Sequence, residues 1–393
     1  MVLKDKKIVL GVTGGIAAYK ACELARMLKK EGAFVRCVMT DAARKFITPL
    51  SLETLSCNPV SYDLFPAAGG GGINHIDLAQ SDLIVIAPAT ANIIGKLAGG
   101  IADDLLTTVV MASKAPVLLA PAMNEWMYEN PAVAENIERL KKRGFRFVGP
   151  ESGELACGRE GTGRLAELED IVEAMREALS KRDMAAEKVL VTAGATREAL
   201  DPVRFLSNAS SGRMGYSMAR AARRRGAEVV LVSGHSVLPE PPGVSVVRVV
   251  SAEEMMEAAI RYFPQSTVVI MAAAVSDFRP VKAHAKKMKK AEAVLTAALE
   301  RTPDILKEMG KKRKGQFLVG FALETEDLVK NASAKLKEKN LDMVVANSPA
   351  GFDSETNEVT IIDRGGKVDV LLPMGKGEIA ERILDRVVSM KAR

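Results

Sequence analysis

The sequence predicts an α/β protein with two domains, and three observations support this expectation. Each half of the chain opens with a short apolar segment, a glycine turn and an alanine-rich helical segment, at residues 7–30 and again at 188–225. Strand-like and helix-like segments then alternate in both halves, which is typical of parallel sheets joined by crossover helices. At 393 residues, the chain is also too long for one typical domain.

Short apolar runs in the first half predict buried strands, because the strands of a parallel sheet are covered on both faces. Helices are expected from the first glycine turn to about residue 30 and again from about residue 169. The polar stretch 180–187 is the expected linker, which places the domains at residues 1–183 and 184–393. The predicted strands occupy residues 7–13, 34–39, 83–87 and 117–120.

The second half repeats this pattern. Residues 215–225 predict a helix, and residues 359–362 and 368–371 flank a polar glycine turn that is typical of a β-hairpin. Both domains are therefore expected to be Rossmann-like or flavodoxin-like, with three layers and mostly parallel sheets. The further predicted strands occupy residues 228–232, 268–271, 317–320 and 343–346.

The composition suits small anionic ligands. The net charge is +6, aromatic residues make up only 4%, and no nucleic-acid-binding motif is found, so no nucleic-acid partner is expected. No apolar run is long enough to span a membrane, and residues 1–15 lack the features of a signal peptide. The four cysteines are scattered without a CxxC pair, so the sequence indicates neither a disulfide framework nor a zinc site. A cytoplasmic protein is the expectation.

Three polar or glycine-rich clusters follow predicted strands of the first half. Gly14-Gly15-Ile16-Ala17 opens a helix whose N–H groups suit a phosphate, although the dinucleotide fingerprint GxGxxG is absent. The other two clusters, 87–92 and 120–124, place Asn92 and Asn124 after prolines at the carboxyl edge of the sheet. Helix capping is the alternative role for both asparagines.

Residues 153–164 place four glycines around Cys157. Such a segment bends freely and favours neither a helix nor a central strand. It predicts a flap that closes over a ligand and brings a thiol to it. An ordinary glycine loop with a bystander cysteine is the alternative.

Together, these four clusters resemble the flavin-dependent cysteine decarboxylases. More closely, the chain is similar to the bifunctional phosphopantothenoylcysteine decarboxylase/phosphopantothenate–cysteine ligases of coenzyme A biosynthesis, whose motifs it matches in order over nearly its whole length. In the first half, the resemblance implies that His75 is an active-site base, Asn124 binds the substrate carboxylate and Cys157 donates a proton to the enethiolate. A structural histidine is the alternative for His75. The implied FMN contacts are Gly14, Gly15, Ile16, Ala17, Thr40, Thr90, Asn92 and Met123.

The chemistry of a cysteinyl carboxylate explains why a flavin is needed. Direct loss of CO2 would leave a carbanion that nothing stabilises. Oxidation of the thiol by the flavin gives a thioaldehyde that accepts those electrons, and reduced flavin and a proton then restore the thiol.

The second half lacks the Walker A pattern GxxxxGK[ST], which excludes a P-loop enzyme. Its run from Thr192 to Gly215 resembles the ligase domain of the same family, and Ser-Ser-Gly before a helix suits a phosphate. The resemblance implies that Asn208 acts on an acyl-nucleotide intermediate, Arg204 helps to bind substrate and Lys287 stabilises nucleotidyl transfer. The implied CTP contacts are Ser210, Ser211, Gly212, Ala273, Asp277, Lys287, Pro303, Asp304, Ile305, Leu306, Phe321, Lys335 and Lys339.

Several alternatives stay open at this level. The lysines at 286–290 are also typical of a solvated surface. Microbial members of the family generally use CTP with Mg2+, for which Asp277 is the candidate ligand, whereas eukaryotic ligases use ATP, and the sequence does not decide between them. Ala195 stands where the family commonly has glycine. A nicotinamide-dependent dehydrogenase, with Asp41 near a ribose, and a non-catalytic nucleotide-binding regulator are the other function classes.

The resemblance thus implies a bifunctional enzyme with small-molecule substrates. Its ligase half would join 4'-phosphopantothenate to cysteine, using CTP, and its flavin half would decarboxylate the product to 4'-phosphopantetheine. The family also implies a homododecamer built from trimeric flavin domains and dimeric ligase domains.

Overall fold

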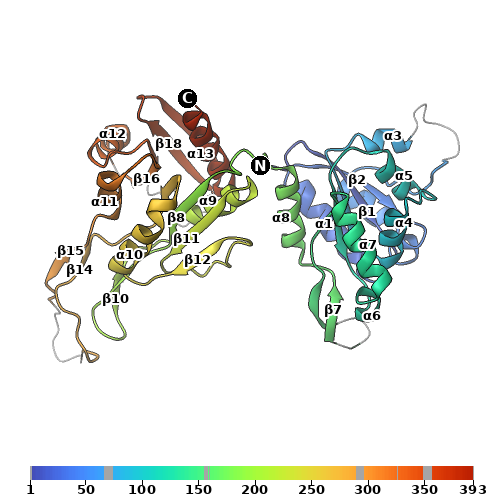
Figure 1. The fold of residues 1–393 in the computed structure, drawn as a ribbon, viewed down its shortest axis with the longest axis horizontal. Coiled ribbons are helices and arrows are strands. Elements are labelled where there is room, and N and C mark those ends of the chain that lie inside the picture. Colours follow the sequence, from blue (N-terminus) through green and yellow to red (C-terminus); the bar gives the residue numbers. More distant parts are fainter. Residues whose placement is uncertain are drawn as a thin grey trace. The chain divides into compact units, whose positions relative to one another are not determined.

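The structure is a computed structural model that describes residues 2–65, 74–154, 158, 160–288, 296–324, 326–347 and 356–392. The chain forms two compact units, Met1–Ser180 and Lys181–Arg393. Each unit has a mostly parallel sheet with helices on both faces (Figure 1). The predicted α/β class is therefore confirmed.

The first unit contains a five-stranded sheet in which all neighbouring strands are parallel. All seven residues of its central strand are buried, as expected for a strand covered on both faces. Pro88 and Pro121, which were expected to follow their strands, instead lie within them. In spatial order, the strands are β2 (Phe34–Met39), β1 (Lys7–Val12), β3 (Leu83–Ala89), β4 (Val117–Pro121) and β5 (Arg146–Phe147).

Alternate strand residues divide the apolar core of this unit into two layers. Ile8, Leu10 and Val85 pack with one set of helices, whereas Val9 and Ile84 pack with the other. The first set is α1 (Ala18–Lys30), α2 (Pro49–Ser56) and α8 (Leu168–Leu179). The second set is α3 (Asn74–Ala79), α4 (Ala91–Gly99), α5 (Leu105–Ala112) and α7 (Pro131–Lys142). Shorter elements are η1 (Ala43–Lys45), α6 (Glu125–Tyr128), β6 (Glu151–Glu154) and β7 (Glu160–Arg164).

The second unit contains an eight-stranded sheet. Its first six strands are parallel, and an antiparallel hairpin adds the last two, which confirms the hairpin predicted near residue 363. In spatial order, the strands are β12 (Ser245–Arg248), β11 (Glu228–Ser233), β8 (Lys188–Ala193), β13 (Val268–Met271), β16 (Phe317–Leu323), β17 (Met343–Asn347), β18 (Thr356–Asp363) and β19 (Val368–Gly375).

Helices again cover both faces of this sheet. One face packs against α9 (Arg213–Arg224) and α13 (Lys376–Lys391). The other packs against α10 (Ala252–Tyr262), α11 (Ile305–Lys312) and α12 (Leu328–Glu338). Two small antiparallel strand pairs are separate from the main sheet. They are β9 (Arg197–Ala199) with β10 (Phe205–Ser207), and β14 (Phe278–Pro280) with β15 (Leu299–Arg301). A short 3-10 helix, η2 (Phe263–Gln265), follows α10.

The polar stretch 180–187, which the sequence predicts as the linker, is anchored to the second unit by two of its residues. Met184 is only 1% exposed and belongs to the core of the second unit. Asp183 Oδ2 lies 2.6 Å from the buried Arg225 guanidinium, which also lies 2.9 Å from Asp385 on α13. Arg225 holds the pKa of Asp183 below its usual value, and burial opposes this effect. Asp183 and Met184 therefore pack with the second unit, which begins at Lys181.

The cysteines outside the glycine-rich segment also differ in environment. Cys37 is buried, and burial raises its pKa to about 12, whereas Cys22 is half-buried. Cys57 is exposed at the end of α2. In the part of the chain that the structure describes, no helix is both long enough and apolar enough to cross a membrane.

Candidate active sites

In the first unit, hydrogen bonds join the carboxyl ends of three strands. The hydroxyl of Thr13, after β1, donates to the Pro88 carbonyl at 2.7 Å and accepts from the Thr90 N–H at 3.2 Å. The Ala122 N–H, after β4, donates to the Ala89 carbonyl at 3.1 Å. Because Thr13 is only 2% exposed, these bonds are shielded from water and fix the three turns to one another.

The glycine turn lies directly against the loop after β2. A Cβ added to Gly14 would lie 2.4 Å from the Ala42 Cβ, so a side chain cannot be accommodated there without movement. The turn leads into α1, whose N-terminus has no side-chain cap. Its first N–H groups are therefore suited to an anionic ligand.

These turns surround a cavity of about 1310 Å³. Asn124 lines the cavity. Its Oδ1 also accepts a hydrogen bond from the Trp126 N–H at 3.0 Å, so Asn124 caps α6 as well. Asn92 lies inside α4 and is not its cap. All of the residues expected to contact FMN line the cavity: Gly14, Gly15, Ile16, Ala17, Thr40, Thr90, Asn92 and Met123.

The walls of this cavity fit a flavin phosphate and its ring system. Ile16 is 62% exposed and Tyr19 is 60% exposed, so the cavity presents large apolar surfaces beside the N-terminus of α1. A flat aromatic ring can pack on such surfaces, while its phosphate meets backbone N–H groups. Among these residues, Tyr19 was not assigned a role from the sequence.

The glycine-rich segment forms the antiparallel β6–β7 hairpin, which is seated on the loop after β4. The Met123 N–H donates to the Gly163 carbonyl at 3.0 Å. A Cβ on Gly163 would lie 2.1 Å from the Met123 carbonyl oxygen, and one on Gly161 would lie 2.4 Å from the Glu125 carboxyl carbon. These glycines are therefore needed for close approach, which brings Glu154, Gly158 and Gly163 to the cavity wall.

Two other residues predicted to be catalytic in this half, Cys157 and His75, are not among the described residues that line the cavity. Cys157 lies outside the described residues. His75 is half-buried on α3, and no residue of α3 lines the cavity. The structure of one chain therefore does not bring His75 to Asn124.

An ionic cluster on the wall was missed from the sequence. Lys96 Nζ lies 2.8 Å from Asp103 Oδ1 and 3.1 Å from Asp104 Oδ2, and all three residues line the cavity. The hydrogen bond with Asp103 is the main cause that raises the pKa of Lys96. Asp104 also accepts from the Thr107 N–H in a capping box at the start of α5. The sequence signal for this helix start was an aspartate, Asp104, three residues before Thr107 and directly before an apolar run.

In the second unit, glycines pack the turn after β8 against the start of α9. Gly194 and Gly212 have φ angles of +75° and +80°, which other residues rarely adopt. A Cβ on Gly215 would lie 2.5 Å from the Ala193 Cβ. This packing places Ser210 and Ser211 at the carboxyl edge of the sheet.

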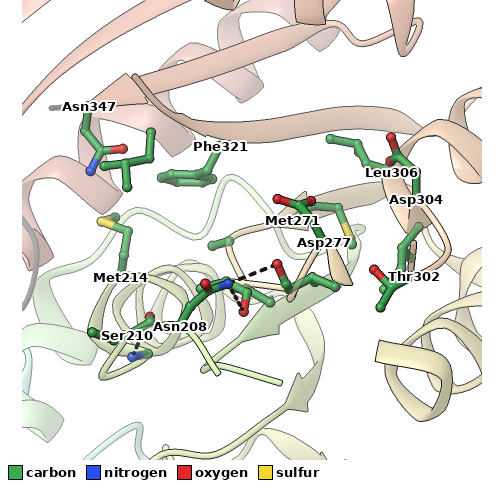
Figure 2. A pocket seen from close by; sticks show the side chains of 18 of the residues that line it. Asn208, Ser210, Met214, Met271, Asp277, Thr302, Asp304, Leu306, Phe321 and Asn347 are labelled. Carbon is green, nitrogen blue, oxygen red and sulfur yellow. Dashed lines mark hydrogen bonds between the residues drawn. The ribbon is translucent and has the colours of Figure 1, made fainter. Parts of the chain in front are cut away.

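A cavity of about 910 Å³ opens there, along the ends of β13, β16 and β17. Asn208 lies on its wall, where its Nδ2 donates to the carbonyl oxygens of Ala274 at 3.2 Å and Val275 at 3.0 Å (Figure 2). The amide of Asn208 is thus oriented by the loop that leads to Asp277. Of the expected CTP contacts, those lining the cavity are Ser210, Ser211, Gly212, Ala273, Asp277, Pro303, Asp304, Ile305, Leu306, Phe321, Lys335 and Lys339.

Lys335 on α12 and Lys339, which caps the C-terminus of this helix, form a positive wall. Lys335 Nζ donates to the Phe321 carbonyl at 2.7 Å, and Lys339 Nζ lies 2.7 Å from Asp304 Oδ2. Burial, and then the charge of Lys339, lower the pKa of Lys335. Two adjacent cations, one of them partly desolvated, attract the phosphates of a nucleotide.

Lys287 and Arg204 do not line the cavity but belong to neighbouring segments. The buried Asp201 accepts hydrogen bonds from the N–H groups of Val203, Arg204 and Met288, the last at 3.2 Å. The Arg204 guanidinium lies 3.6 Å from the same carboxylate and donates to the Met288 carbonyl at 3.5 Å. Asp201, for which no role was predicted, therefore fastens the segment that contains Lys287.

The described wall of this cavity offers only two carboxylates to a magnesium ion. The described residues contain no group of three or more His, Cys, Asp or Glu side chains able to hold a metal. Two carboxylates line the cavity, and Asp304 is paired with Lys339. Asp277 has no such pairing among the described side chains and could share Mg2+ with nucleotide phosphates.

Comparison with known proteins places both units in described families. The family model "Flavoprotein" matches residues 2–180, and "DNA/pantothenate metabolism flavoprotein C-terminal domain" matches residues 184–390. The "Coenzyme A biosynthesis bifunctional protein CoaBC" of Bacillus subtilis (strain 168) is 46% identical to this chain, covering 99% of it and 98% of the relative. The protein of the same name from Escherichia coli (strain K12) is 43% identical, with the same coverage.

Among solved structures, the C-terminal domain of a coenzyme A biosynthesis bifunctional protein CoaBC is 42% identical. It covers 54% of this chain and 99% of its own, with a TM-score of 0.48. The sequence identity to the full-length relatives, over nearly the whole of both chains, decides the assignment. The chain belongs to the family of bifunctional coenzyme A biosynthesis proteins.

Proposed function

We propose that this chain joins 4'-phosphopantothenate to cysteine and then decarboxylates the product to 4'-phosphopantetheine. One observation carries this conclusion. A single chain of the bifunctional family contains two different cavities, each at the carboxyl edge of a mostly parallel sheet. We assign the flavin activity to the unit Met1–Ser180 and the ligase activity to the unit Lys181–Arg393.

In the flavin domain, the residues around the first cavity fit FMN. The N–H groups at the start of α1 would hold the phosphate, and Ile16, Tyr19 and Met123 would pack on the ring system. When bound, FMN supplies reversible two-electron oxidation of the substrate thiol. Asn124 orients the substrate carboxylate through its amide, and the β6–β7 hairpin excludes water above it.

Proton transfer in this domain is assigned to Cys157 and His75. An ordinary thiol is mostly protonated at neutral pH, as a proton donor must be. In the sequence, Cys157 stands between Glu154 and Gly158, which both line the cavity. His75 would need a second copy of the chain to reach a cavity, which agrees with the proposed trimer of flavin domains.

In the ligase domain, the second cavity supports activation of a carboxylate by CTP. Lys335 and Lys339 would bind phosphate oxygens, and the backbone N–H groups of Ile305 and Leu306 at the start of α11 would add donors. Asp277 would hold Mg2+ together with the nucleotide phosphates. Asn208 lies on the cavity wall, held by the Ala274 and Val275 carbonyls, where it would contact the acyl-nucleotide. Lys287 and Arg204 would act from the segment that Asp201 fastens. Cysteine then attacks the activated carbonyl carbon and releases CMP.

The absorption spectrum and product analysis of the purified protein test both halves. We expect flavin bands, and CO2 release that requires 4'-phosphopantothenate, cysteine, CTP and Mg2+. Supplying 4'-phosphopantothenoylcysteine directly should remove the need for CTP, which separates the two steps. A protein that binds no FMN after reconstitution, or releases no CO2 from that substrate, would contradict the flavin assignment.

Replacement of CTP by ATP tests nucleotide choice in the same assay. Light scattering of the purified protein tests the proposed homododecamer, and cell fractionation tests the proposed cytoplasmic location.

A further inference from the structure

In the ligase domain, the turn after β8 runs beside the loop after β13, and backbone hydrogen bonds join the two. The Ala274 N–H donates to the Gly194 carbonyl at 2.9 Å, and the Thr196 N–H donates to the Ala274 carbonyl at 3.4 Å. The loop after β13 leads to Asp277, and both Ala274 and Asp277 line the cavity. The turn after β8 therefore supports this part of the cavity wall.

Thr196 also connects this loop to the segment that contains Asn208. Its side chain is fully buried, and its hydroxyl oxygen accepts a hydrogen bond from the Ser276 N–H at 2.9 Å. Its carbonyl oxygen accepts a hydrogen bond from the Ser207 hydroxyl at 2.7 Å. Ser207 directly precedes Asn208, and Ser276 directly precedes Asp277. Thr196 is thus bonded next to two residues that have predicted roles in the ligase reaction.

The amide of Asn208 closes a ring of hydrogen bonds around this connection. Its Nδ2 donates to the Ala274 carbonyl at 3.2 Å (Figure 2), and the same oxygen accepts from the Thr196 N–H. The members of this ring are Thr196, Ser207, Asn208 and Ala274. Hydrogen bonds that are shielded from water hold their partners firmly, because a broken bond leaves a buried polar group without compensation.

Thr302 holds the backbone at Asp277 from the strand β15 side. The Thr302 hydroxyl donates to the Ser276 carbonyl, and the Thr302 N–H donates to the Asp277 carbonyl at 3.0 Å. The backbone at Ser276 and Asp277 is therefore bonded to both Thr196 and Thr302. Thr302 lines the cavity, whereas Thr196 is not among the described residues that do so.

We infer that Thr196 is a positioning residue of the ligase reaction, which holds Asn208 and Asp277 at a fixed separation. This inference rests on the proposed function, in which both residues face the bound nucleotide. A displacement of about 1 Å between groups that act on one substrate can lower a rate roughly 100-fold. Thr196 would therefore affect the rate of ligation through two other residues and without contacting the substrate.

Steady-state ligation by two variants tests this role. Thr196→Val removes the acceptor of the Ser276 N–H while nearly keeping the shape of the side chain, and it should lower kcat roughly 10- to 100-fold. KM for CTP should stay within about twofold, because the contacts of Lys335 and Lys339 lie outside the ring. Thr196→Ser keeps the hydroxyl and should restore most of kcat.

Thr267→Val is the matched control. The Thr267 hydroxyl also accepts a backbone hydrogen bond, from the Lys188 N–H at 3.0 Å, but it lies at the amino edge of the same sheet, away from the cavity. Its loss should leave kcat unchanged. Thermal unfolding of both valine variants shows whether a fall in kcat merely follows a loss of stability.

Amide hydrogen exchange, measured by mass spectrometry, gives a readout that does not depend on activity. Thr196→Val should increase exchange in peptides that cover residues 205–209 and in those that cover residues 272–278, because both segments are bonded to Thr196. Exchange in α12 should stay unchanged. Thr196→Ser should resemble the wild type in both segments.

The outcomes separate this inference from the proposed function. A wild-type protein that forms no amide contradicts the proposed function itself. If the wild type is active and Thr196→Val keeps its kcat, or loses no more than Thr267→Val does, only the positioning role is wrong. Failure of Thr196→Ser to restore kcat, or increased exchange in only one of the two segments, would also overturn that role.

Discussion

The two cavities occupy the same place in their folds but have different walls. Both lie at the carboxyl ends of parallel strands, where turns bring N–H groups and polar side chains together. The flavin cavity presents the exposed apolar groups of Ile16 and Tyr19, whereas the ligase cavity presents Lys335, Lys339 and Lys376. Topology thus gives the location of each site, and side chains decide between redox chemistry and phosphate chemistry.

The two sites also differ in how their covering segments are held. The β6–β7 hairpin is seated by glycines whose backbones approach the loop after β4. The segment with Lys287 is fastened by one buried carboxylate, Asp201, through the Met288 N–H. Substitution of these groups should therefore affect one activity and spare the other.

Asn124→Asp should have the largest effect. Aspartate is as good a helix N-cap as asparagine, so α6 should keep its cap while a negative charge faces the substrate carboxylate. Like charges in contact cost several kcal/mol, so we expect decarboxylation of 4'-phosphopantothenoylcysteine to fall by roughly 1000-fold, with ligation unchanged. CO2 release and CTP-dependent ligation are measured on the same preparation.

Asn130→Asp is the matched control, because Asn130 caps α7 through the Ala132 N–H without lining the cavity. Decarboxylation that survives in Asn124→Asp would refute the carboxylate-binding role.

Gly163→Ala should have the next largest effect. Its Cβ would lie 2.1 Å from the Met123 carbonyl oxygen, so the hairpin must move away from the cavity. A displacement of about 1 Å can cost roughly 100-fold in rate, which we expect for decarboxylation but not for ligation. Gly95→Ala, where a Cβ meets its nearest neighbour at 3.8 Å, should leave both rates unchanged. Full decarboxylation by Gly163→Ala would show that the seating of the hairpin is unimportant.

Asp201→Asn should affect only the ligase. In the asparagine, an NH2 group replaces one carboxylate oxygen. This group cannot accept the hydrogen bond from the Met288 N–H, so the segment with Lys287 loses its attachment. We expect kcat of acyl-nucleotide formation to fall about tenfold, with little change in KM for CTP. Rapid-quench measurement of the intermediate tests this, with Asp369→Asn on β19 as the exposed control. A rise in KM with unchanged kcat would argue against a positioning role.

The pH dependence of CTP binding should show the smallest effect. Burial and Lys339 lower the pKa of Lys335 below its ordinary value of 10.5, so Lys335 loses its charge earlier than an exposed lysine as pH rises. Phosphates bind the charged form, and CTP affinity should therefore fall a few-fold through this lowered pKa.

Lys335→Arg should remove this fall, because a guanidinium group stays charged. Calorimetry between about pH 7 and about pH 10 checks both expectations, with the exposed Lys330→Arg as control. An unchanged pH profile in Lys335→Arg would mean that another group titrates.

Local sequence patterns predicted the main sheets well because buried parallel strands are continuous apolar runs. The runs at 34–39 and 268–271 match β2 and β13. β12 and the small β9–β10 and β14–β15 pairs were missed, since short strands with exposed residues leave no such run.

Contacts between distant segments could not be predicted in this way. The polar residues before β8 were interpreted as a linker because nothing nearby in sequence indicates that Arg225 pairs with Asp183. Asp201 and Met288 lie far apart in the sequence, and only the fold joins them through a hydrogen bond. The location of the turns that follow the strands was easier to predict, because the carboxyl ends of all parallel strands lie at one edge of the sheet.

The residues before β8 decide where the second unit can be separated from the first. A polypeptide that begins at Lys188 contains every strand and helix of that unit, yet it lacks the Met184 side chain that fills its core and the Asp183 carboxylate that faces Arg225. Loss of a buried methionine alone costs about 2–5 kcal/mol, a large part of the stability of a typical domain. The natural start of the ligase unit is therefore set by a buried side chain and an ion pair, several residues ahead of its first strand.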